Sequence, residues 1–498
     1  MPKDPVLFEL AAAACRGLPG PEGGMRRLIE KLFGSRYHSR HLAPSAIRDA
    51  YGRHGGDAEE GVPFAGLIHP DNPPKGPYGG TSVVWFPTKE HGSLIDFGAG
   101  TRGLSPDEGI LTRPGHRRRM ISLRRYLARR GIEAWTKPDP TALGIPVPKV
   151  VQARFPGFEH VFSRYGGEMY ACAKVPSDPE EAYAVLQAFL DLYAYERGYG
   201  VHKAWEPEYA TFHDALRNDL FPGTSATEVD ALLRKRRFVV LQGPPGTGKS
   251  RLADELRRQC FDGRGMTVQF HPAFTYEDFV VGLAPDATER TLRFDVRRGA
   301  LLAAVEEAKR GPFLLHIDEV NRADLGKVLG EAIYLFEPAE IGGPNARRVR
   351  LPHPVKLGEE VTNELALPDT LFVLCTMNTA DRSIANLDIA VRRRFAFINM
   401  PPDRNVVAAR KIDLATRVFD LVTDVFVEHA PGDALDLLPG HAYFLAESEP
   451  ELVERIRYEL LPLLDEYLHQ GVLGPASHEL AAVRDKIEDL VGIHGRRA

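Results

Sequence analysis

The octapeptide GPPGTGKS constrains the fold of this chain more than any other feature. The apolar run Phe238 to Leu241 precedes it, and the stretch that starts near Lys249 has helical character. This order predicts a strand, a glycine-rich loop and a helix, because glycines let backbone N–H groups turn toward phosphate oxygens. A glycine-rich turn without a ligand is the alternative. The candidate phosphate-binding residues are Gly243, Pro244, Pro245, Gly246, Thr247, Gly248, Lys249 and Ser250.

A second acidic motif lies about seventy residues later, in GPFLLHIDEVNRAD. Its apolar residues predict a strand, and Asp318 and Glu319 follow at the carboxyl end, where α/β folds place their ligands. Asp318, together with the hydroxyl of Ser250, is a candidate Mg²⁺ ligand, and Glu319 is a candidate for polarising an attacking water. A strand that ends in a solvated Asp-Glu turn is the alternative.

The segment LFVLCTMN (371–378) predicts another strand of the same sheet, which ends at Asn378. An amide at that position can hold a water against Glu319. The basic segment AVRRRF follows on a predicted helix, and we expect Arg393 or Arg394 to reach the γ-phosphate of a neighbouring subunit. Such an arginine stabilises the charge that develops in phosphoryl transfer. A solvated basic helix end is the alternative.

The chain of 498 residues is long enough for two to four domains. Strand-like and helix-like segments mix in the first part, whereas apolar strands alternate with helices after Phe238 and helices dominate the end. We therefore expect an α/β P-loop core with a parallel sheet and a helical C-terminal part, preceded by a separate α+β domain. The expected boundaries are 1–200 for the N-terminal recognition domain, 201–225 for a linker, 226–400 for the core and 401–498 for the helical C-terminal part.

Four scattered cysteines without CxxC spacing indicate neither a zinc site nor a disulfide framework. No apolar run approaches the roughly 20 residues that a membrane span needs. These features predict a cytoplasmic protein that does not enter a membrane.

An arginine-rich stretch, TRPGHRRRMISLRRYLARR (112–130), stands out in the first domain. Residues 1–200 carry 26 Lys and Arg against 22 Asp and Glu, which favours this half for contact with a polyanion. Aromatic residues on nearby strands, Tyr78, Trp85, Phe86 and Phe97, are candidates for stacking a base. A solvated or salt-bridged helix face is the alternative. The candidate nucleic-acid contacts are Arg117, Arg118, Arg119, Arg124 and Arg125.

Taken in order, GPPGTGKS, FHPAFTYEDFVVGLAP, IDEVNRADLGKVLGE, TMNTADRS, LDIAVRRRF and GHAYF make residues 225–470 resemble the McrB branch of the AAA+ ATPases. The resemblance implies a five-stranded parallel core sheet, a C-terminal helical lid at 401–498 and a hexameric ring. It also implies Mg²⁺-dependent use of ATP or GTP, and a partner like McrC that stimulates hydrolysis and carries the nuclease. It also implies roles for individual residues. Asn378 resembles sensor 1, Arg393 and Arg394 the arginine-finger region, and Asp381 and Arg382 the signature at the subunit interface.

Together with the motifs, this resemblance implies an NTP-hydrolysing motor in bacterial defence, which drives or gates a partner nuclease on foreign DNA. Its expected nucleic-acid partner is double-stranded DNA or another nucleic acid. Two other functions remain open at this point. One is a remodelling chaperone similar to the MoxR proteins, whose target is protein. The other is a nucleotide-dependent scaffold that recruits an effector.

Overall fold

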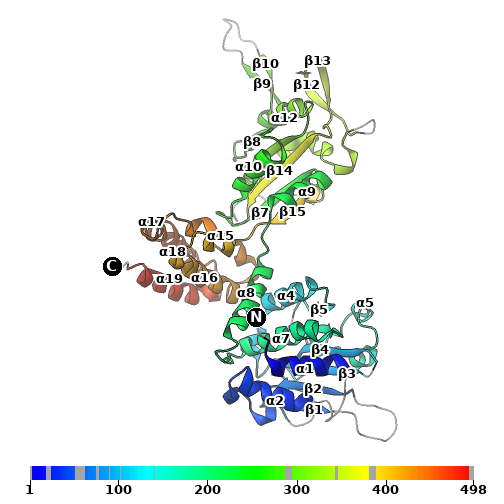
Figure 1. Ribbon diagram of the computed structural model, residues 1–498. Coiled ribbons are helices and arrows are strands. Elements are labelled where there is room, and N and C mark those ends of the chain that lie inside the picture. The colour runs from blue at the N-terminus through cyan, green and yellow to red at the C-terminus, as the bar shows by residue number, and fades with distance from the viewer. Residues whose placement is uncertain are drawn as a thin grey trace. The chain divides into compact units, whose positions relative to one another are not determined.

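The chain forms two compact units, which are described separately below. One contains Met1–Phe221 with Val427–His429, and the other contains Pro222–Phe426 with Ala430–Ala498. Figure 1 labels the helices and strands of both. The computed structural model describes residues 3–17, 24–50, 62–73, 78–88, 90–100, 102–139, 141–285, 294–342, 346–380 and 389–492.

A six-stranded antiparallel sheet forms the centre of the N-terminal unit, with the strand order β1-β2-β3-β4-β6-β5. Strands β3 and β4 pair in this sheet, with Val83 opposite Phe97. The α+β prediction is thus confirmed. The strands are β1 (Ile47–Ala50), β2 (Phe64–Ile68), β3 (Thr81–Thr88), β4 (Gly92–Ala99), β5 (Ala134–Thr136) and β6 (Met169–Val175).

Helices cover both faces of this sheet because its strands alternate two apolar sets of side chains. Ile95 and Phe97 pack in the larger core with α1, α2, α4, α7 and α8, whereas Leu94 packs in a smaller core with α5 and α6. The helices are α1 (Pro5–Arg16), α2 (Met25–Ser35), α3 (Glu108–Leu111), α4 (Pro114–Ala128), α5 (Lys149–Gln152), α6 (Glu159–Tyr165), α7 (Pro179–Glu196) and α8 (Glu206–Leu220).

Helix α8 occupies most of the segment 201–225, which the sequence suggested as a linker. Phe212 and Leu216 are each 3% exposed and belong to the larger core of the N-terminal unit. The two compact units divide after Phe221. The N-terminal unit therefore reaches about one helix further along the chain than the sequence indicated.

A five-stranded parallel sheet forms the centre of the second unit, with the order β15-β7-β14-β11-β8. Val239 and Leu241 face one apolar cluster, and Phe238 and Val240 face another, so both faces of the sheet are covered. This arrangement confirms the predicted core. Its strands are β7 (Phe238–Gly243), β8 (Gly265–Gln269), β11 (Phe313–Asp318), β14 (Leu371–Asn378) and β15 (Ala396–Asn399).

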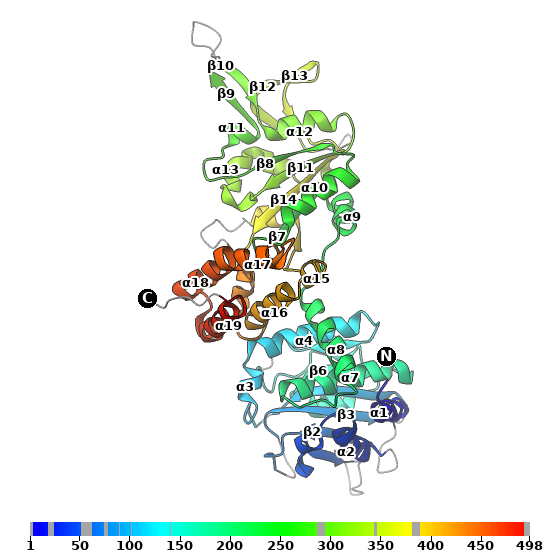
Figure 2. The same cartoon turned by 60° about the vertical axis from the view of Figure 1, so that its left-hand side comes forward.

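Helices α9 and α10 cover one face of the sheet, and α12 and α13 cover the other (Figure 2). Two antiparallel hairpins, β9–β10 and β12–β13, belong to the same unit. The remaining elements of this core are α9 (Ala226–Arg236), α10 (Lys249–Cys260), α11 (Tyr276–Phe279), β9 (Val281–Pro285), β10 (Phe294–Arg298), α12 (Ala300–Ala308), α13 (Leu325–Leu329), β12 (Val349–Leu357), β13 (Glu360–Leu365) and α14 (Ile389–Arg392).

Helices follow the last strand, as predicted for the lid. They are α15 (Arg404–Ala408), α16 (Asp413–Glu428), α17 (Glu449–Arg455), α18 (Leu461–Gln470) and α19 (Ser477–Leu490), with a π-helical turn at 456–460 between α17 and α18. The short helix η8 (His441–Phe444) contains the GHAYF motif except for its glycine. Within the described part of the chain, every helix is too short or too polar to cross a membrane.

Candidate active site

The GPPGTGKS loop connects the end of β7 to the start of α10, as the sequence predicted. Gly246 and Gly248 have φ angles of 78° and 79°, in the left-handed region where a side chain is strained. A Cβ on Gly243 would lie 2.2 Å from the carbonyl oxygen of Met400. The glycines are therefore required by the backbone path, and the loop opens onto the N-terminus of α10.

Lys249 lies folded over this loop and is only 7% exposed. Its Nζ donates to the carbonyl oxygens of Gly243 at 3.0 Å and Pro244 at 2.7 Å. Burial lowers the pKa of Lys249 to about 8, although the charges of Glu319 and Asp318 act in the opposite direction. Phosphate oxygens at this loop would give the ammonium group an anionic partner and so favour its charged form.

Asp318 ends β11 beside the loop. The Ser250 Oγ donates to Asp318 Oδ1 at 3.0 Å, and the hydroxyl of Thr376 on β14 donates to the same oxygen. Because β11 and β14 are neighbouring parallel strands, their carboxyl ends meet at one edge of the sheet. Two strands and the first turn of α10 thus bring Asp318, Ser250 and Thr376 together.

Glu319 has a left-handed backbone, with φ 55° and ψ 47°. Strain of this kind in a non-glycine residue is concentrated at functional sites. The Asn378 Nδ2 donates to Glu319 Oε1, and the Arg322 Nε lies 3.6 Å from Glu319 Oε2. Asn321 fixes the end of β14 by donating from Nδ2 to the carbonyl oxygen of Asn378 at 3.2 Å. The predicted pair Glu319 and Asn378 therefore meets directly.

The lid contributes backbone contacts to the same loop. Gly440 N donates to Pro245 O at 3.2 Å, and a Cβ on Gly440 would lie 2.2 Å from the carbonyl carbon of Gly246. His441 is 9% exposed, and its Nδ1 accepts a bond from Asp403 N at 3.2 Å. Burial lowers the pKa of His441, so the neutral ring is favoured as an acceptor. Through Gly440, the GHAYF motif packs the lid directly against the phosphate loop.

The three consecutive arginines at 392–394 differ in their environment. Arg392 lies over the ring of Phe397 at 5.5 Å, Arg393 is exposed, and Arg394 is only 5% exposed. Burial lowers the pKa of Arg394, as does the charge of Arg393, while the charge of Glu337 raises it. The three guanidinium groups therefore lie in different environments, and of these three Arg394 is the buried one.

These arginines lie near the start of the strands, whereas their own phosphate loop follows the end of β7. They directly precede β15, which pairs parallel with β7 so that Ala396 is opposite Val239 near the start of that strand. The loop follows β7 at its other end. Six residues of strand span roughly 20 Å, so Arg393 cannot act on the phosphates held by its own chain without a large rearrangement. Asp381 and Arg382, the other predicted interface residues, lie outside the described residues.

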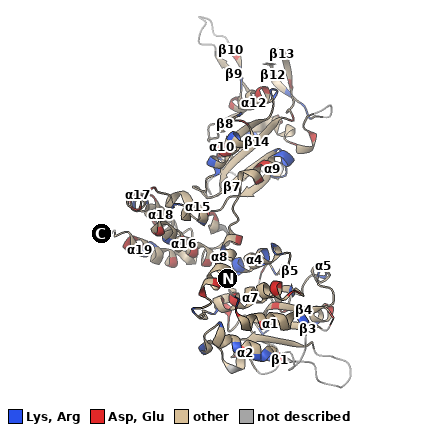
Figure 3. Cartoon of the chain, viewed as in Figure 1, with Lys and Arg blue, Asp and Glu red and all other residues tan. Residues whose placement is uncertain are grey.

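The arginines predicted to contact nucleic acid lie on or near α4 (Figure 3). Arg119 is buried and forms two bonds with Glu196, from Nε at 2.7 Å and from Nη2 at 2.9 Å. Arg117 is exposed and pairs with Asp139 at 2.9 Å. Arg125 donates to the backbone oxygen of Asp219 at 2.8 Å, and Arg118 and Arg124 lie on the same helix. Arg119 therefore has a structural ion pair and Arg118 is only 6% exposed, so neither presents its side chain at the surface, whereas Arg117, Arg124 and Arg125 are exposed.

The aromatic side chains suggested for base stacking are mostly buried. Trp85, Phe86 and Phe97 are 4%, 2% and 0% exposed and pack in the cores on the two faces of the sheet. They are strand residues that fill the interior, so the suggestion that they stack a base was wrong. Tyr78 is half-buried, at the start of the segment that leads into β3.

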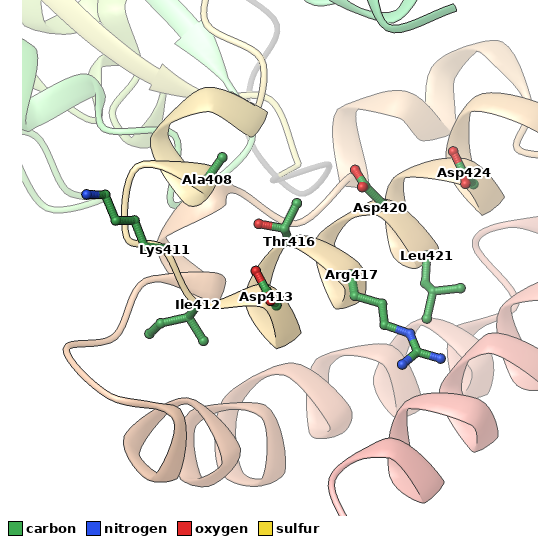
Figure 4. Close-up of a pocket in the computed structure, with 9 residues that line it drawn as sticks. All are labelled: Ala408, Lys411, Ile412, Asp413, Thr416, Arg417, Asp420, Leu421 and Asp424. Carbon is green, nitrogen blue, oxygen red and sulfur yellow. The ribbon is translucent and has the colours of Figure 1, made fainter. Parts of the chain in front are cut away.

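A hollow of about 500 Å³ in the lid contains none of the predicted site residues (Figure 4). It lies on α15 and α16, where Arg404 holds Asp420 through two bonds of 2.8 Å. Its charged residues are of both signs, so it has no clear preference for a charged ligand. The hollow is lined by Ala408, Lys411, Ile412, Asp413, Thr416, Arg417, Asp420, Leu421 and Asp424.

Sequence reasoning missed several residues of the site. Thr376 and Asn321 carry hydrogen bonds among the acidic residues and Asn378. Thr376 could have been found, because it lies two residues before Asn378 and so on the same face of the strand. Gly440 could not, because its contact joins segments about two hundred residues apart in the chain.

Comparisons with known proteins agree with this geometry. Residues 238–395 match the model of the AAA domain (dynein-related subfamily). The Type IV methyl-directed restriction enzyme EcoKMcrB subunit of Escherichia coli (strain K12) is 30% identical over 357 residues, which cover 64% of this chain and 75% of that protein. The Type II restriction enzyme BsuMI component YdiS of Bacillus subtilis (strain 168) is 25% identical over 215 residues, or 35% of this chain and 61% of that protein.

A crystal structure of a putative ATPase from Cytophaga hutchinsonii covers 52% of this chain and 79% of its own, at 13% identity and a TM-score of 0.24, which is too low to bear on the fold. The match to the AAA domain and the identity over three quarters of the Escherichia coli protein are the informative results. Together they show that this chain belongs to the McrB family of AAA+ NTPases, the motor subunits of modification-dependent restriction systems.

Proposed function

We propose that this chain hydrolyses ATP or GTP with Mg²⁺ in a homo-hexameric ring in the cytoplasm, and that the ring drives or gates an McrC-like nuclease on foreign double-stranded DNA. The observation that carries the proposal is the meeting of Ser250, Asp318, Glu319 and Asn378 beside the phosphate loop. In this proposal these groups bind the metal ion and position the attacking water beside the γ-phosphate of a nucleotide on this loop.

The oxygen donors present suit Mg²⁺. This ion prefers a few protein oxygens and takes its other ligands from water and substrate phosphates. Ser250 Oγ and Asp318 Oδ1, 3.0 Å apart, supply such oxygens at the N-terminus of α10. When bound, the ion would neutralise charge on the phosphate oxygens, while Lys249 and the loop N–H groups hold the β and γ positions.

Glu319 and Asn378 are proposed to hold the attacking water. Their direct bond puts a carboxylate and an amide on adjacent strand ends, and the amide limits where the carboxylate can point. A water held by both side chains would donate to Glu319 and face the γ-phosphate in line with the leaving group. Thr376 and Asn321 position these two residues and do not touch substrate in this proposal.

Arg393 is proposed as the arginine supplied to the neighbouring subunit. It is exposed, whereas Arg394 is buried beside it, and both lie far along the sheet from their own loop. A guanidinium delivered to the γ-phosphate from the next subunit stabilises developing charge. Arg394, and Asp381 and Arg382 from the signature segment, are proposed to shape the same subunit boundary.

The partners are proposed from the relatives. Both matched proteins are named as components of restriction enzymes, and one is called methyl-directed. The N-terminal unit is the proposed recognition domain, where the exposed Arg117, Arg124 and Arg125 are available to phosphates, whereas Arg118 on the same helix is buried.

The test is hydrolysis of ATP and of GTP by the purified full-length protein with Mg²⁺, measured with EDTA, with methylated and with unmethylated double-stranded DNA. We expect Mg²⁺-dependent turnover with at least one nucleotide, its loss in Glu319→Gln with nucleotide binding kept, and a change in turnover with DNA. A hydrolysis rate that is unchanged by DNA but changes when unfolded protein is added would favour a remodelling chaperone. Cellular defence that survives Glu319→Gln would favour a scaffold.

A further inference from the structure

Three phenylalanines from distant parts of the sequence form one buried aromatic cluster beneath the arginines. Their ring centroids are 4.9 Å apart for Phe238 and Phe336, 5.6 Å for Phe238 and Phe395, and 5.9 Å for Phe336 and Phe395. The planes of the last pair are stacked at 21°. Phe238 and Phe336 are fully buried, and Phe395 is 6% exposed. Rings at these distances attract one another beyond the effect of burial.

The cluster connects two functional segments. Phe238 begins β7, whose other end leads into the phosphate loop, and Phe395 directly follows Arg394. Phe336 follows η5 (Gly330–Leu335), in the part of the chain that continues from Glu319. Its ring contacts both of the other rings, which also contact each other, so Phe336 helps to pack the arginine segment against the strand that carries the loop.

The residue after Phe336 reinforces this contact. The charge of Glu337 acts on the Arg394 guanidinium, and Glu337 is itself 3.9 Å from Arg347. Phe336 therefore packs against Phe395, and the charge of the adjacent Glu337 attracts the guanidinium of the adjacent Arg394. Arg393, the residue before Arg394, is exposed next to this packed segment.

We propose that Phe336 is a positioning residue for the arginine given to the neighbouring subunit, acting through its stacked contact with Phe395. The inference rests on the proposed ring and its arginine in trans. It assigns Phe336 no contact with nucleotide. Loss of the aromatic side chain of Phe336 would let the Arg393 segment shift. A displacement of about 1 Å at a charge-stabilising group is enough to lower turnover strongly.

The experiment mixes two kinds of subunit, so that only one kind of site can work. Arg393→Ala subunits keep Glu319 in their own site but supply no Arg393 to the neighbouring subunit. Glu319→Gln subunits supply Arg393 to the neighbour but cannot hydrolyse nucleotide in their own site. Turnover in the mixture then comes from Arg393→Ala sites that receive an arginine from a Glu319→Gln donor. We expect the donor that also carries Phe336→Leu to restore at least tenfold less turnover than the Glu319→Gln donor, at equal entry into rings.

Two further donors keep the result interpretable. Phe395→Leu removes the other ring of the stacked pair and should give the same loss, and it carries the test if Phe336→Leu fails to fold. Phe261→Leu is the matched control, because Phe261 is 2% exposed and contacts Phe372 at 5.3 Å in the apolar cluster on the other face of the sheet. Its donor should restore turnover fully.

A second readout separates positioning from general damage. In subunits that keep Glu319, Phe336→Leu should lower kcat at least tenfold and leave the KM for nucleotide unchanged. Full rescue by both the Phe336→Leu and the Phe395→Leu donors would overturn the proposal. Absence of rescue by the plain Glu319→Gln donor would instead mean that the arginine does not act in trans, so the proposed ring itself would fail.

Discussion

Two runs of three arginines, at 117–119 and at 392–394, look alike in sequence and differ in structure. In the first, Arg119 is buried against Glu196 inside the N-terminal unit, and Arg117 pairs with Asp139 on its surface. In the second, Arg394 is buried beside Glu337, and Arg393 is exposed at the edge of the core sheet. The difference lies in what surrounds each run. An arginine that is buried against a carboxylate of its own unit has a structural role. An exposed arginine beside a rigid strand is available to another chain.

Removal of Arg393 should have the largest effect. We expect Arg393→Ala to lower turnover by about 10³-fold or more, as loss of an arginine at the γ-phosphate does in related chemistry. Arg117→Ala is the matched control from the other run and should leave basal turnover unchanged. Steady-state hydrolysis at saturating nucleotide measures both. If the two variants behaved alike, the distinction between the two runs would be lost.

Removal of Arg119 should act on stability instead. It would leave Glu196 buried without its guanidinium, and breaking a buried pair in this way costs about 3–5 kcal/mol. We expect Arg119→Ala to lower the free energy of unfolding of the N-terminal unit by that amount, as measured by denaturant unfolding of the full chain. Hydrolysis per folded molecule should persist. A folded, fully stable Arg119→Ala protein would contradict a structural role for Arg119.

Acid should weaken the same cluster. Burial alone would raise the pKa of Glu196, but its bond to His116 and the charge of Arg119 outweigh burial and lower it from 4.5 to about 2. Because the folded pKa is depressed, this stabilisation is complete above about pH 4.5 and is lost as the pH falls through about 2. It amounts to about 3 kcal/mol. Unfolding of Glu196→Gln should show a flatter pH dependence over this window, and an unchanged slope would contradict the assignment.

The smallest effect is expected for Arg117. Its pair with Asp139 is exposed on both sides, and such pairs contribute about 0–1 kcal/mol. Arg117→Ala should therefore leave unfolding nearly unchanged. The DNA affinity of Arg117→Ala should be lower than that of the unaltered protein if the helix contacts phosphates. The slope of log affinity against log salt concentration should then decrease by about 1. Equal DNA affinity of Arg117→Ala and the unaltered protein at low salt would remove Arg117 from the proposed interface.

The core was predictable because its motifs are local. The phosphate loop needs consecutive glycines, and Asp318, Glu319 and Asn378 end apolar strands, so parallel pairing alone brings them together. The burial of Arg119 against Glu196 was not predictable, because the two residues are 77 positions apart and no local sequence feature indicates the pair. Trp85, Phe86 and Phe97 misled for a related reason. Strand aromatics fill a core as readily as they stack a base, and only the packing of helices on both faces decides between the two.

The arginine in trans is the central claim, and mixing of inactive variants tests it most directly. Glu319→Gln and Arg393→Ala proteins would each be assayed alone for hydrolysis and then together over a range of ratios. We predict that each is inactive alone and that the mixture recovers turnover, with a maximum at intermediate ratios, because a Glu319 site then receives Arg393 from its neighbour. A mixture that stays inactive at every ratio, while mixed rings are seen to form, would contradict the claim.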